Sequence, residues 1–423
     1  MSNLAVEAAF SGSRRLREHP FKRVLRRVEL RVGEDRGTQR LSLSSAGHVY
    51  KREGASDRQQ ASEATEERSL RVAPDQLVVN PMWLTGGSIA VSDVEGAVSP
   101  DYRVFDPHGE MVHARYLHHL LRSQPYRDQY NLYVRANTTF DRRIQQEDLD
   151  QLPLWLPDLD DQRRIADFLD DHVARIDQII AARQTQRHHV AQSTVARLQE
   201  LQDEWTRRYG ETRLGRVLVG LEQGWSPQAE ATEAGPDEWG VMRAGCVNDG
   251  IFREHDNKRL PEGTEPQRKY ELDRGDLLMS RASGSLDKIG STAVVPAEVR
   301  SRLLLCDKVY RLRLAPGWEA HFIAPMLRTH KSRQAIRLGV SGAEGMANNL
   351  PSGVIRSLNV PLLSEDRQAD CALAAATVEN QGRDAERALV SSIDLLSEYK
   401  QSLITAAVTG ELDVTTAGSG IPG

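Results

Sequence analysis

The second half of this chain repeats the pattern of the first, and this duplication constrains the fold more than any other feature. Four residues recur 206 positions later: Leu152, Leu154, Leu156 and Gln162 are matched by Leu358, Val360, Leu362 and Gln368. The same offset pairs the segment 116–122 with 322–328. Further upstream the offset is 200 and pairs 77–79 with 277–279, so the copies differ in length by six residues. We therefore expect two similar units in tandem.

Each copy ends in a segment with the spacing of a long helix. Its apolar residues alternate steps of three and four, as in a coiled coil, and then continue less regularly. In the first copy they include Leu169, Val173, Ile176, Ile180, Leu198 and Trp205, and in the second Leu389, Ile393, Leu396 and Leu403. Asp158 and Ser364 are candidate N-caps, and Gly210 and Gly410 can end the helices. Because a small domain cannot bury helices this long, we expect them to pack together and to hold the globular parts apart.

The remainder of each copy is divided by glycine and proline into short apolar runs. Runs such as 76–80 and 277–280 are typical of strands, and a helical stretch near 112–123 recurs near 319–338. The predicted fold class is α+β: two mixed α/β domains in tandem, each followed by a long helix, with the helices packed as an antiparallel coiled coil. The predicted parts are an N-terminal segment (1–20), a globular domain (21–157), a helix (158–210), a second domain (211–363), a second helix (364–412) and a flexible tail (413–423).

Composition excludes several classes of protein. The 423 residues are 39% hydrophobic and 27% charged, which indicates a globular protein with a polar surface. Cys246, Cys306 and Cys371 lie far apart, so neither a disulfide scaffold nor a cysteine-rich zinc site is expected, and the cytoplasm is the predicted compartment. No apolar run approaches the ~18 residues that span a bilayer. The net charge of −5 does not by itself indicate a nucleic-acid ligand.

Several short motifs resemble catalytic sequences only in part. Residues 80–83 (NPMW) resemble the Asn-Pro-Pro-aromatic loop of amino-methyltransferases, but the second proline is missing and no glycine-rich loop for S-adenosylmethionine follows a strand. The chain has no Walker-type phosphate loop, and 339–343 (GVSGA) misses the nucleophile elbow by its last glycine. The pairs His118–His119 and His188–His189 lack companion ligands at metal spacing. We therefore predict no catalytic residue and no metal site.

Polar and aromatic residues in or beside turns form a candidate DNA-binding surface in each copy. Long hydrogen-bond donors at such places can reach bases and phosphates. Taken singly, each of these residues is better explained by ordinary surface hydrogen bonding. As groups, the loops that carry them indicate a binding function: Asn80, Trp83, Tyr102, Arg142 and Arg143 in the first copy, and Trp225, Arg243, Asn248, Arg281, Ser283 and Lys288 in the second.

The complete pattern resembles the specificity subunit of a type I restriction–modification system, in which two target-recognition domains alternate with two conserved helical regions. Leu152–Ile165 (LPLWLPDLDDQRRI) is similar to the start of the first helical region, and Ser397–Val414 (SEYKQSLITAAVTGELDV) to the C-terminal ending of the family. Gln76–Ser92 and Gly275–Ser285 resemble parts of recognition domains. The second junction, Val360–Gln368 (VPLLSEDRQ), departs from the family because it lacks the usual Pro-Pro.

The resemblance implies a subunit that catalyses nothing itself. Family members bind a bipartite, asymmetric target in double-stranded DNA, one half-site per domain, and recruit two modification subunits that methylate adenine and restriction subunits that translocate and cut DNA. S-adenosylmethionine, ATP and Mg²⁺ would belong to those partners, so no cofactor is expected in this chain, and no membrane. The helix residues named above would pack the helices and their partners. Two alternatives stay open: a self-sufficient DNA adenine methyltransferase that uses the 80–83 loop, and a coiled-coil protein adaptor without DNA readout.

Overall fold

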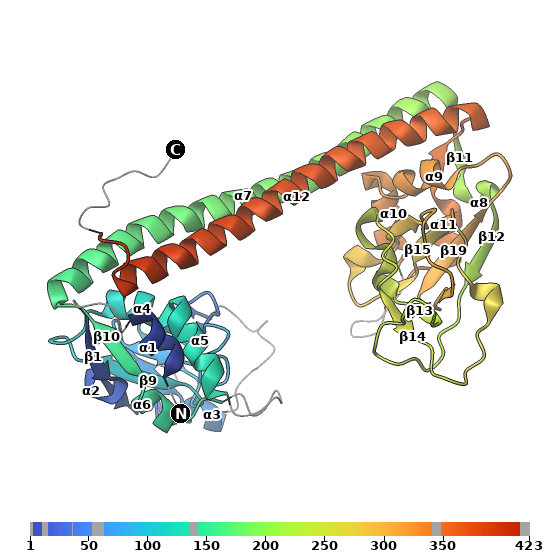
Figure 1. Cartoon of the computed structure of the whole chain (residues 1–423). Coiled ribbons are helices and arrows are strands. Elements are labelled where there is room, and N and C mark those ends of the chain that lie inside the picture. The colour runs from blue at the N-terminus through green and yellow to red at the C-terminus, as the bar shows by residue number, and fades with distance from the viewer. Residues whose placement is uncertain are drawn as a thin grey trace. The chain divides into compact units, whose positions relative to one another are not determined.

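The structure consists of two compact units, and each of the two predicted long helices is divided between them. The computed structural model describes residues 3–10, 16–35, 37–52, 63–134, 143–340 and 348–414. Unit 1 comprises Met1–Arg183 with Ser392–Gly423, and unit 2 comprises Gln184–Ser391. Each unit therefore contains one globular domain, the start of the helix that follows it and the end of the other long helix. The fold is α+β, with tandem mixed domains and packed long helices, as predicted (Figure 1).

Unit 1 is built on an antiparallel sheet of four strands in the order β2–β9–β6–β7. Strand alternation sends Leu77, Val79 and Phe105 into one core, under the helices, and Val78 and Val104 into a second core on the opposite face. The sheet strands are β2 (Leu25–Val28), β6 (Leu77–Val79), β7 (Ile89–Val91) and β9 (Arg103–Pro107). The other strands pair as β1 (Arg17–Pro20) with β10 (Pro153–Leu156), β3 (Leu41–Leu43) with β4 (Val49–Lys51), and β5 (Leu70–Val72) with β8 (Gly96–Val98). The helices are α1 (Leu4–Phe10), α2 (Phe21–Val24), α3 (Glu63–Arg68), α4 (Ala114–Arg122), α5 (Gln124–Tyr133) and α6 (Gln146–Asp150).

Unit 2 repeats this plan with a sheet of order β12–β19–β15–β17. Its strands are β12 (Leu218–Gln223), β15 (Leu277–Ser280), β17 (Thr292–Val294) and β19 (Val309–Leu314). Smaller sheets join β14 (Asn257–Arg259), β13 (Gly240–Met242) and β18 (Leu303–Leu304), then β11 (Glu211–Arg213) and β21 (Asn359–Pro361), and β16 (Ala282–Ser283) and β20 (Asn348–Asn349). The helices are α8 (Leu214–Val217), α9 (Ala320–Met326), α10 (His330–Gly339) and α11 (Ser352–Ser357), with 3₁₀ turns η1 (Ala244–Gly250), η2 (Arg268–Tyr270) and η3 (Leu286–Lys288).

Two equivalent glutamines show how closely the copies correspond. The Gln162 Oε1 accepts a hydrogen bond from the His113 backbone N at 2.8 Å, and the Gln368 Oε1 accepts one from the Glu319 N at 2.9 Å. Both side chains are fully buried, and both donate Nε2 hydrogens to two backbone carbonyls that again lie 206 positions apart: Met111 and Pro157 in unit 1, and Gly317 and Leu363 in unit 2. Because sheet order and buried contacts both repeat, the predicted duplication is confirmed.

The long helices are α7 (Leu159–Tyr209) and α12 (Glu365–Thr409). The Asp158 Oδ1 accepts a hydrogen bond from the Asp161 N at 2.9 Å and so caps α7, as predicted. Gly210 and Gly410 follow the last helical residues with φ of 82° and 81°, the left-handed backbone that ends a helix. Within unit 1 the Lys400 Nζ lies 2.6 Å from the Asp177 Oδ1.

Within unit 2 the two helices also run antiparallel at close range. The Arg187 Nε lies 2.8 Å from the Glu386 Oε1, and the Arg197 Nη1 donates to the Gln381 Oε1 at 2.9 Å, so numbers rise in α7 as they fall in α12. Gly382 faces Thr194 so closely that a Cβ would collide with the Thr194 side chain. This glycine therefore lets the two backbones approach each other.

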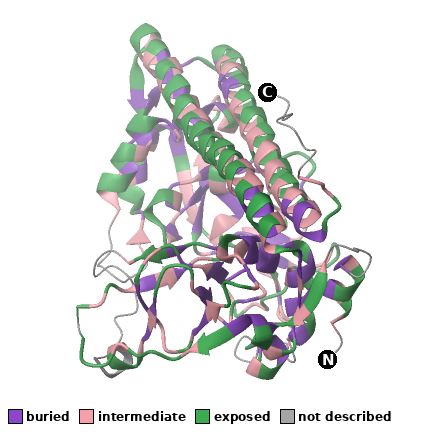
Figure 2. Ribbon diagram, turned by 90° about the vertical axis from the view of Figure 1, so that its left-hand side faces the viewer, coloured by how far each residue is buried: buried purple, intermediate pink, exposed green. Residues whose placement is uncertain are grey.

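Burial along the long helices is concentrated at their ends, where they enter the globular cores (Figure 2). Of the predicted packing residues, Leu169, Ile176, Leu198 and Trp205 are buried, while Val173, Ile180, Leu389, Ile393, Leu396 and Leu403 are half-buried. The middle of a two-helix pair has only one neighbour, which explains the partial burial there. Over the described ranges, the structure contains no helix with both the length and the apolar character of a membrane span.

The ends of the chain differ from the prediction of separate terminal segments. The side chains of Val6 and Phe10 are fully buried in the core of unit 1, and β1 pairs with β10 over four residues. Residues 4–10 and 17–20 are thus part of the first domain, because α1 supplies an apolar face too short to stand out in the sequence. At the other end, Val414 packs against the same core, and residues 415–423 of the predicted tail lie outside the described residues.

Candidate nucleic-acid interface

Some of the predicted binding residues of each copy lie at one end of the equivalent sheets. In unit 1 the last residue of β6, Val79, pairs with the first residue of β9, Arg103. In unit 2 the last residue of β15, Ser280, pairs with the first residue of β19, Val309. We call this the loop end of each sheet, because the chain leaves β6 or β15 and enters β9 or β19 there. Sheet register thus brings together loops that are far apart in the sequence.

At the loop end of unit 1, three predicted residues lie side by side. The Asn80 Oδ1 accepts a hydrogen bond from the Met82 N at 3.2 Å and closes a turn, and the Asn80 side chain also hydrogen-bonds the Tyr102 hydroxyl. Burial raises the pKa of Tyr102, and the Asn80 contact opposes that shift. Trp83 belongs to the same turn, and its side chain is 53% exposed. An exposed indole therefore lies beside the partly buried Tyr102 side chain.

Cationic side chains lie beside this group. The Arg143 Nη2 is 3.2 Å from the Asp101 Oδ1, so Arg143 is held next to Tyr102 by a neighbouring carboxylate. Burial lowers the pKa of Arg103, and the nearby charges of Arg27 and Arg143 lower it further. Three guanidinium groups are therefore close enough to interact. Arg103 was not among the residues predicted from the sequence, where its signal is an arginine at the start of a strand, and the predicted Arg142 lies outside the described residues.

At the loop end of unit 2, Arg281 is anchored from both its backbone and its side chain. Its backbone N donates to the Lys308 carbonyl at 2.8 Å. Its Nε donates to the Tyr310 hydroxyl at 3.3 Å, its Nη1 donates to the Asp307 carbonyl at 3.2 Å, and the guanidinium lies 5.8 Å from the centre of the Tyr310 ring. Ser283 follows in β16, paired with Asn348.

The predicted turn around Trp225 joins Arg281 through Asp307. The Ser226 hydroxyl hydrogen-bonds the Asp307 carboxylate, and the Lys308 Nζ lies 2.6 Å from the Asp307 Oδ2. Burial raises the pKa of Asp307, but the bonds from Lys308 and Ser226 outweigh it and leave that pKa lowered. The Trp225 N donates to the Leu305 carbonyl at 2.9 Å. Asp307, Lys308 and Tyr310 were missed from sequence, since nothing local marks the start of β19 as a site.

Asn248 and Lys288 form a second group in unit 2. The Lys288 Nζ is 2.8 Å from the Asp249 Oδ1, and the Arg253 Nη2 is 3.0 Å from the Asp249 Oδ2. The Asn248 carbonyl accepts from the Arg253 Nη1 at 2.6 Å, whereas its buried Oδ1 has no hydrogen-bond partner among the described residues. Arg243 is bonded elsewhere, with its Nη2 donating to the Ala231 carbonyl at 2.7 Å and its Nε 3.9 Å from the Asp256 Oδ1.

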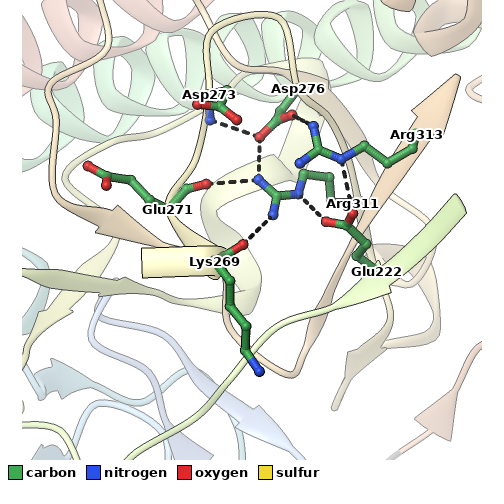
Figure 3. A network of polar contacts seen from close by, with 7 residues as sticks. All are labelled: Glu222, Lys269, Glu271, Asp273, Asp276, Arg311 and Arg313. Carbon is green, nitrogen blue, oxygen red and sulfur yellow. Dashed lines mark hydrogen bonds and ion pairs between the residues drawn. The ribbon is translucent and has the colours of Figure 1, made fainter. Parts of the chain in front are cut away.

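A buried ion network lies on the sheet of unit 2, and sequence reasoning did not identify it (Figure 3). The Arg311 side chain is 1% exposed and contacts the Asp276 Oδ2 at 3.0 Å and the Glu222 Oε2 at 2.7 Å. It also donates to the Glu271 and Lys269 carbonyls at 2.8 and 3.0 Å. Burial disfavours the Arg311 charge, but the two carboxylates leave its pKa raised. The network joins Glu222 of β12 and Arg311 of β19 to Asp276, which directly precedes β15, and so ties these three strands together.

The histidine pair of α4 belongs to the structure of unit 1. The His119 Nε2 and the Arg115 Nη1 lie 2.7 and 2.6 Å from the two carboxylate oxygens of Asp170 in α7. Burial raises the pKa of Asp170, but the hydrogen bonds from His119 and Arg115 dominate and lower it to about 2. Throughout the described residues, no group of three or more histidine, cysteine or acidic side chains is placed to hold a metal ion.

His118→Asn should weaken the pH dependence of stability. Burial lowers the pKa of His118 well below 6.5, the charges of His119 and Arg122 add to this, and Asp170 opposes it. Below about pH 6.5 His118 is protonated in the unfolded chain but stays neutral in the folded chain. The free energy of unfolding therefore falls by up to about 1.4 kcal/mol for each unit by which the pH is lowered. Urea unfolding at pH 7.5 and 5.5 should show a difference about 1 kcal/mol smaller in the variant. The matched control is His189→Asn, in an exposed position of α7. Equal differences in His118→Asn and wild type would contradict the expectation.

No protein-family model matches the chain. It is 31% identical over 153 residues, 36% of its length, to the Type I restriction enzyme EcoEI specificity subunit of Escherichia coli, a match that covers 25% of that relative. It is 23% identical over 328 residues, 72% of its length, to the Type I restriction enzyme EcoKI specificity subunit of Escherichia coli strain K12, covering 66% of that relative. The chain thus spans less than two thirds of either relative.

One solved structure is similar over nearly the whole chain. It is described as "Structural basis underlying complex assembly and conformational transition of the type I R-M system". The similarity has a TM-score of 0.66 at 15% identity and covers 95% of this chain and 99% of that chain. At this identity, the match establishes the fold.

Proposed function

This chain is a relative of type I restriction enzyme specificity subunits, and we propose that it is the sequence-reading subunit of a type I restriction–modification complex. Each unit would bind one half of a bipartite target in double-stranded DNA. The observation that supports this most is the arrangement of the two loop ends. The same sheet position carries aromatic, hydroxyl and cationic side chains in both copies, and these are the groups that contact bases and phosphates.

The two loop ends carry unlike side chains, which favours an asymmetric target. Unit 1 offers the Trp83 indole, the Tyr102 hydroxyl and Arg143, whereas unit 2 offers Arg281 and Lys308. Different side chains hydrogen-bond to different base edges. Two domains with different side chains at their loop ends would therefore select different half-sites. Exchanging one domain would then alter only the half-site that this domain reads.

Catalysis would belong to partners in this proposal. Two modification subunits would methylate adenine with S-adenosylmethionine, and restriction subunits would use ATP and Mg²⁺, all in the cytoplasm. Half-buried apolar side chains along α7 and α12 offer surface for helix packing by such partners. This chain would supply sequence recognition and no cofactor site.

The methyltransferase alternative is not favoured by the 80–83 loop. The Asn80 side chain, which would have to hold the target base, is already engaged by the Met82 N and the Tyr102 hydroxyl. Calorimetry of the purified chain with S-adenosylmethionine separates the two functions. We expect no binding, and saturable binding would support the enzyme.

Replacing residues 211–363 by the corresponding domain of another type I specificity subunit should change one half of the methylated motif completely and leave the other half unchanged. The measurement is sequencing of methylated adenines in cells that also produce the cognate modification subunits. Exchange of residues 4–157, which include α1 and β1, is the matched control and should change the opposite half. If either exchange altered both halves, or neither, the proposal of one half-site per unit would be wrong. A protein adaptor would direct no sequence-specific methylation in any of these strains.

A further inference from the structure

Arg281 occupies a position where the two copies differ in chemistry. The offset of 200 that matches Leu77 with Leu277 places Pro81 at the equivalent position of unit 1. The residue before it ends the pairing of β15 with β19, so Arg281 is the first residue at the loop end. Unit 2 thus has a guanidinium where unit 1 has a side chain without any hydrogen-bond donor.

Arg281 also differs from the other predicted cations of unit 2 in its partners. Lys288 pairs with Asp249, and the Arg243 Nε lies within 4.0 Å of Asp256. Arg281 is bonded to a backbone carbonyl and a hydroxyl, and among the described residues no carboxylate lies within ion-pair distance of it. The nearby Asp307 carboxylate is already engaged by Lys308 and Ser226. The charge of Arg281 is therefore held in place without being neutralised by an ion pair.

The contacts of Arg281 leave one edge of its guanidinium available. The Nε and one hydrogen of Nη1 are used by Tyr310 and Asp307, and in the described part of the chain Nη2 has no acceptor. The remaining hydrogens of Nη1 and Nη2 form a two-pronged donor. In the major groove, guanine presents two adjacent acceptors, N7 and O6, to which arginine donates in bidentate fashion. A guanidinium that is already oriented loses little freedom on making this contact.

We propose that Arg281 reads a guanine in the half-site of unit 2 by donating from Nη1 and Nη2 to N7 and O6, and that Tyr310 positions it. This inference rests on the proposed function and adds to it a base and the residue that selects it. Unit 1 makes no equivalent contact, because Pro81 carries no donor. Phosphate binding by Arg281 would also use its charge, but it would not depend on two donors held in fixed geometry.

The test uses the complex of the full chain with its modification subunits. Methylation rates are measured on duplexes in which each position of the unit 2 half-site is varied in turn. Arg281→Lys keeps the charge but removes the paired donors, so we expect it to lower the preference for one G·C pair by about 10- to 100-fold, with preferences elsewhere unchanged. Arg281→Ala should give the same loss at the same position. Tyr310→Phe keeps the ring and removes the acceptor of Nε, and should give a smaller loss there.

Arg216→Lys and Arg216→Ala are the matched controls. Arg216 is exposed in α8, and because Leu218 pairs with Leu314, it lies at the opposite end of the sheet from Arg281. These variants should keep the wild-type preference. Unchanged preference in Arg281→Lys, or an equal loss of rate on every duplex, would overturn the assignment. If Arg281→Ala does not fold, Arg281→Lys and Tyr310→Phe still decide. A wild-type complex with no two-part preference would instead overturn the proposed function and the inference with it.

Discussion

Replacing Arg311 by alanine should lower the free energy of unfolding of unit 2 by about 3–5 kcal/mol. The substitution removes the buried cation of the Asp276 side chain, which is 5% exposed, and leaves it only the partly exposed Arg313 as an ion-pair partner. It also removes the donor from the Glu271 and Lys269 carbonyls. A buried charge that loses its partner keeps its desolvation penalty, which is why the loss exceeds that of a surface pair. Chemical unfolding followed by circular dichroism measures the change.

The first copy supplies the control for this prediction. Val104 is the equivalent of Arg311 in the sheet of unit 1. Val104 pairs with Val78 of β6 and Val28 of β2. In the same way, Arg311 pairs with Leu278 of β15 and Glu222 of β12. Gln76 stands at the position of Asp276, and its Oε1 accepts from the Ala73 N at 2.8 Å as Asp276 accepts from the Asp273 N at 2.9 Å. The triple variant Arg311→Val, Glu222→Val, Asp276→Gln should therefore be more stable than Arg311→Ala, since no buried charge is left alone. If Arg311→Ala cost less than about 1 kcal/mol, or if the triple variant were less stable still, the network would not have the role described.

Trp205→Ala should destabilise unit 2 by about 3–5 kcal/mol. Trp205 lies near the end of α7, its side chain is 7% exposed, and its ring centre is 6.0 Å from that of Phe322 in α9. Truncation would remove the contact and leave a cavity in the core. Leu373→Ala, at a residue of α12 that is 69% exposed, is the control and should change stability by less than about 0.5 kcal/mol. Equal stability of the two variants would show that the end of α7 is not part of the second core.

The features that sequence predicted well are those with local signals. The cap at Asp158 and the left-handed glycines 210 and 410 act within one helical turn, so they mark the ends of α7 and α12 without knowledge of the rest of the fold. The duplication could be recognised from the sequence because the buried glutamines and the apolar residues around them recur at the same offset in both copies.

The grouping of the candidate site could not be read in the same way. Ser226 and Asp307 meet across 81 positions, and Arg281 reaches the Asp307 carbonyl only because β15 pairs with β19 in one register. The sequence therefore indicates the turn residues only individually, and it does not indicate their partners Lys308 and Tyr310. The Arg311 network was also hidden, because its arginine looks like any other charged residue until the sheet buries it.

The division of α12 between the two units determines when each core can close during synthesis. The core of unit 1 includes Ile404, Ala407 and Val408 from the last turns of α12, whereas the core of unit 2 needs nothing beyond Ser391. The first domain therefore leaves the ribosome with an apolar patch uncovered, and it stays so while the whole second domain is made. The core of the domain that is translated first is therefore completed last, and until then its uncovered apolar patch is open to aggregation.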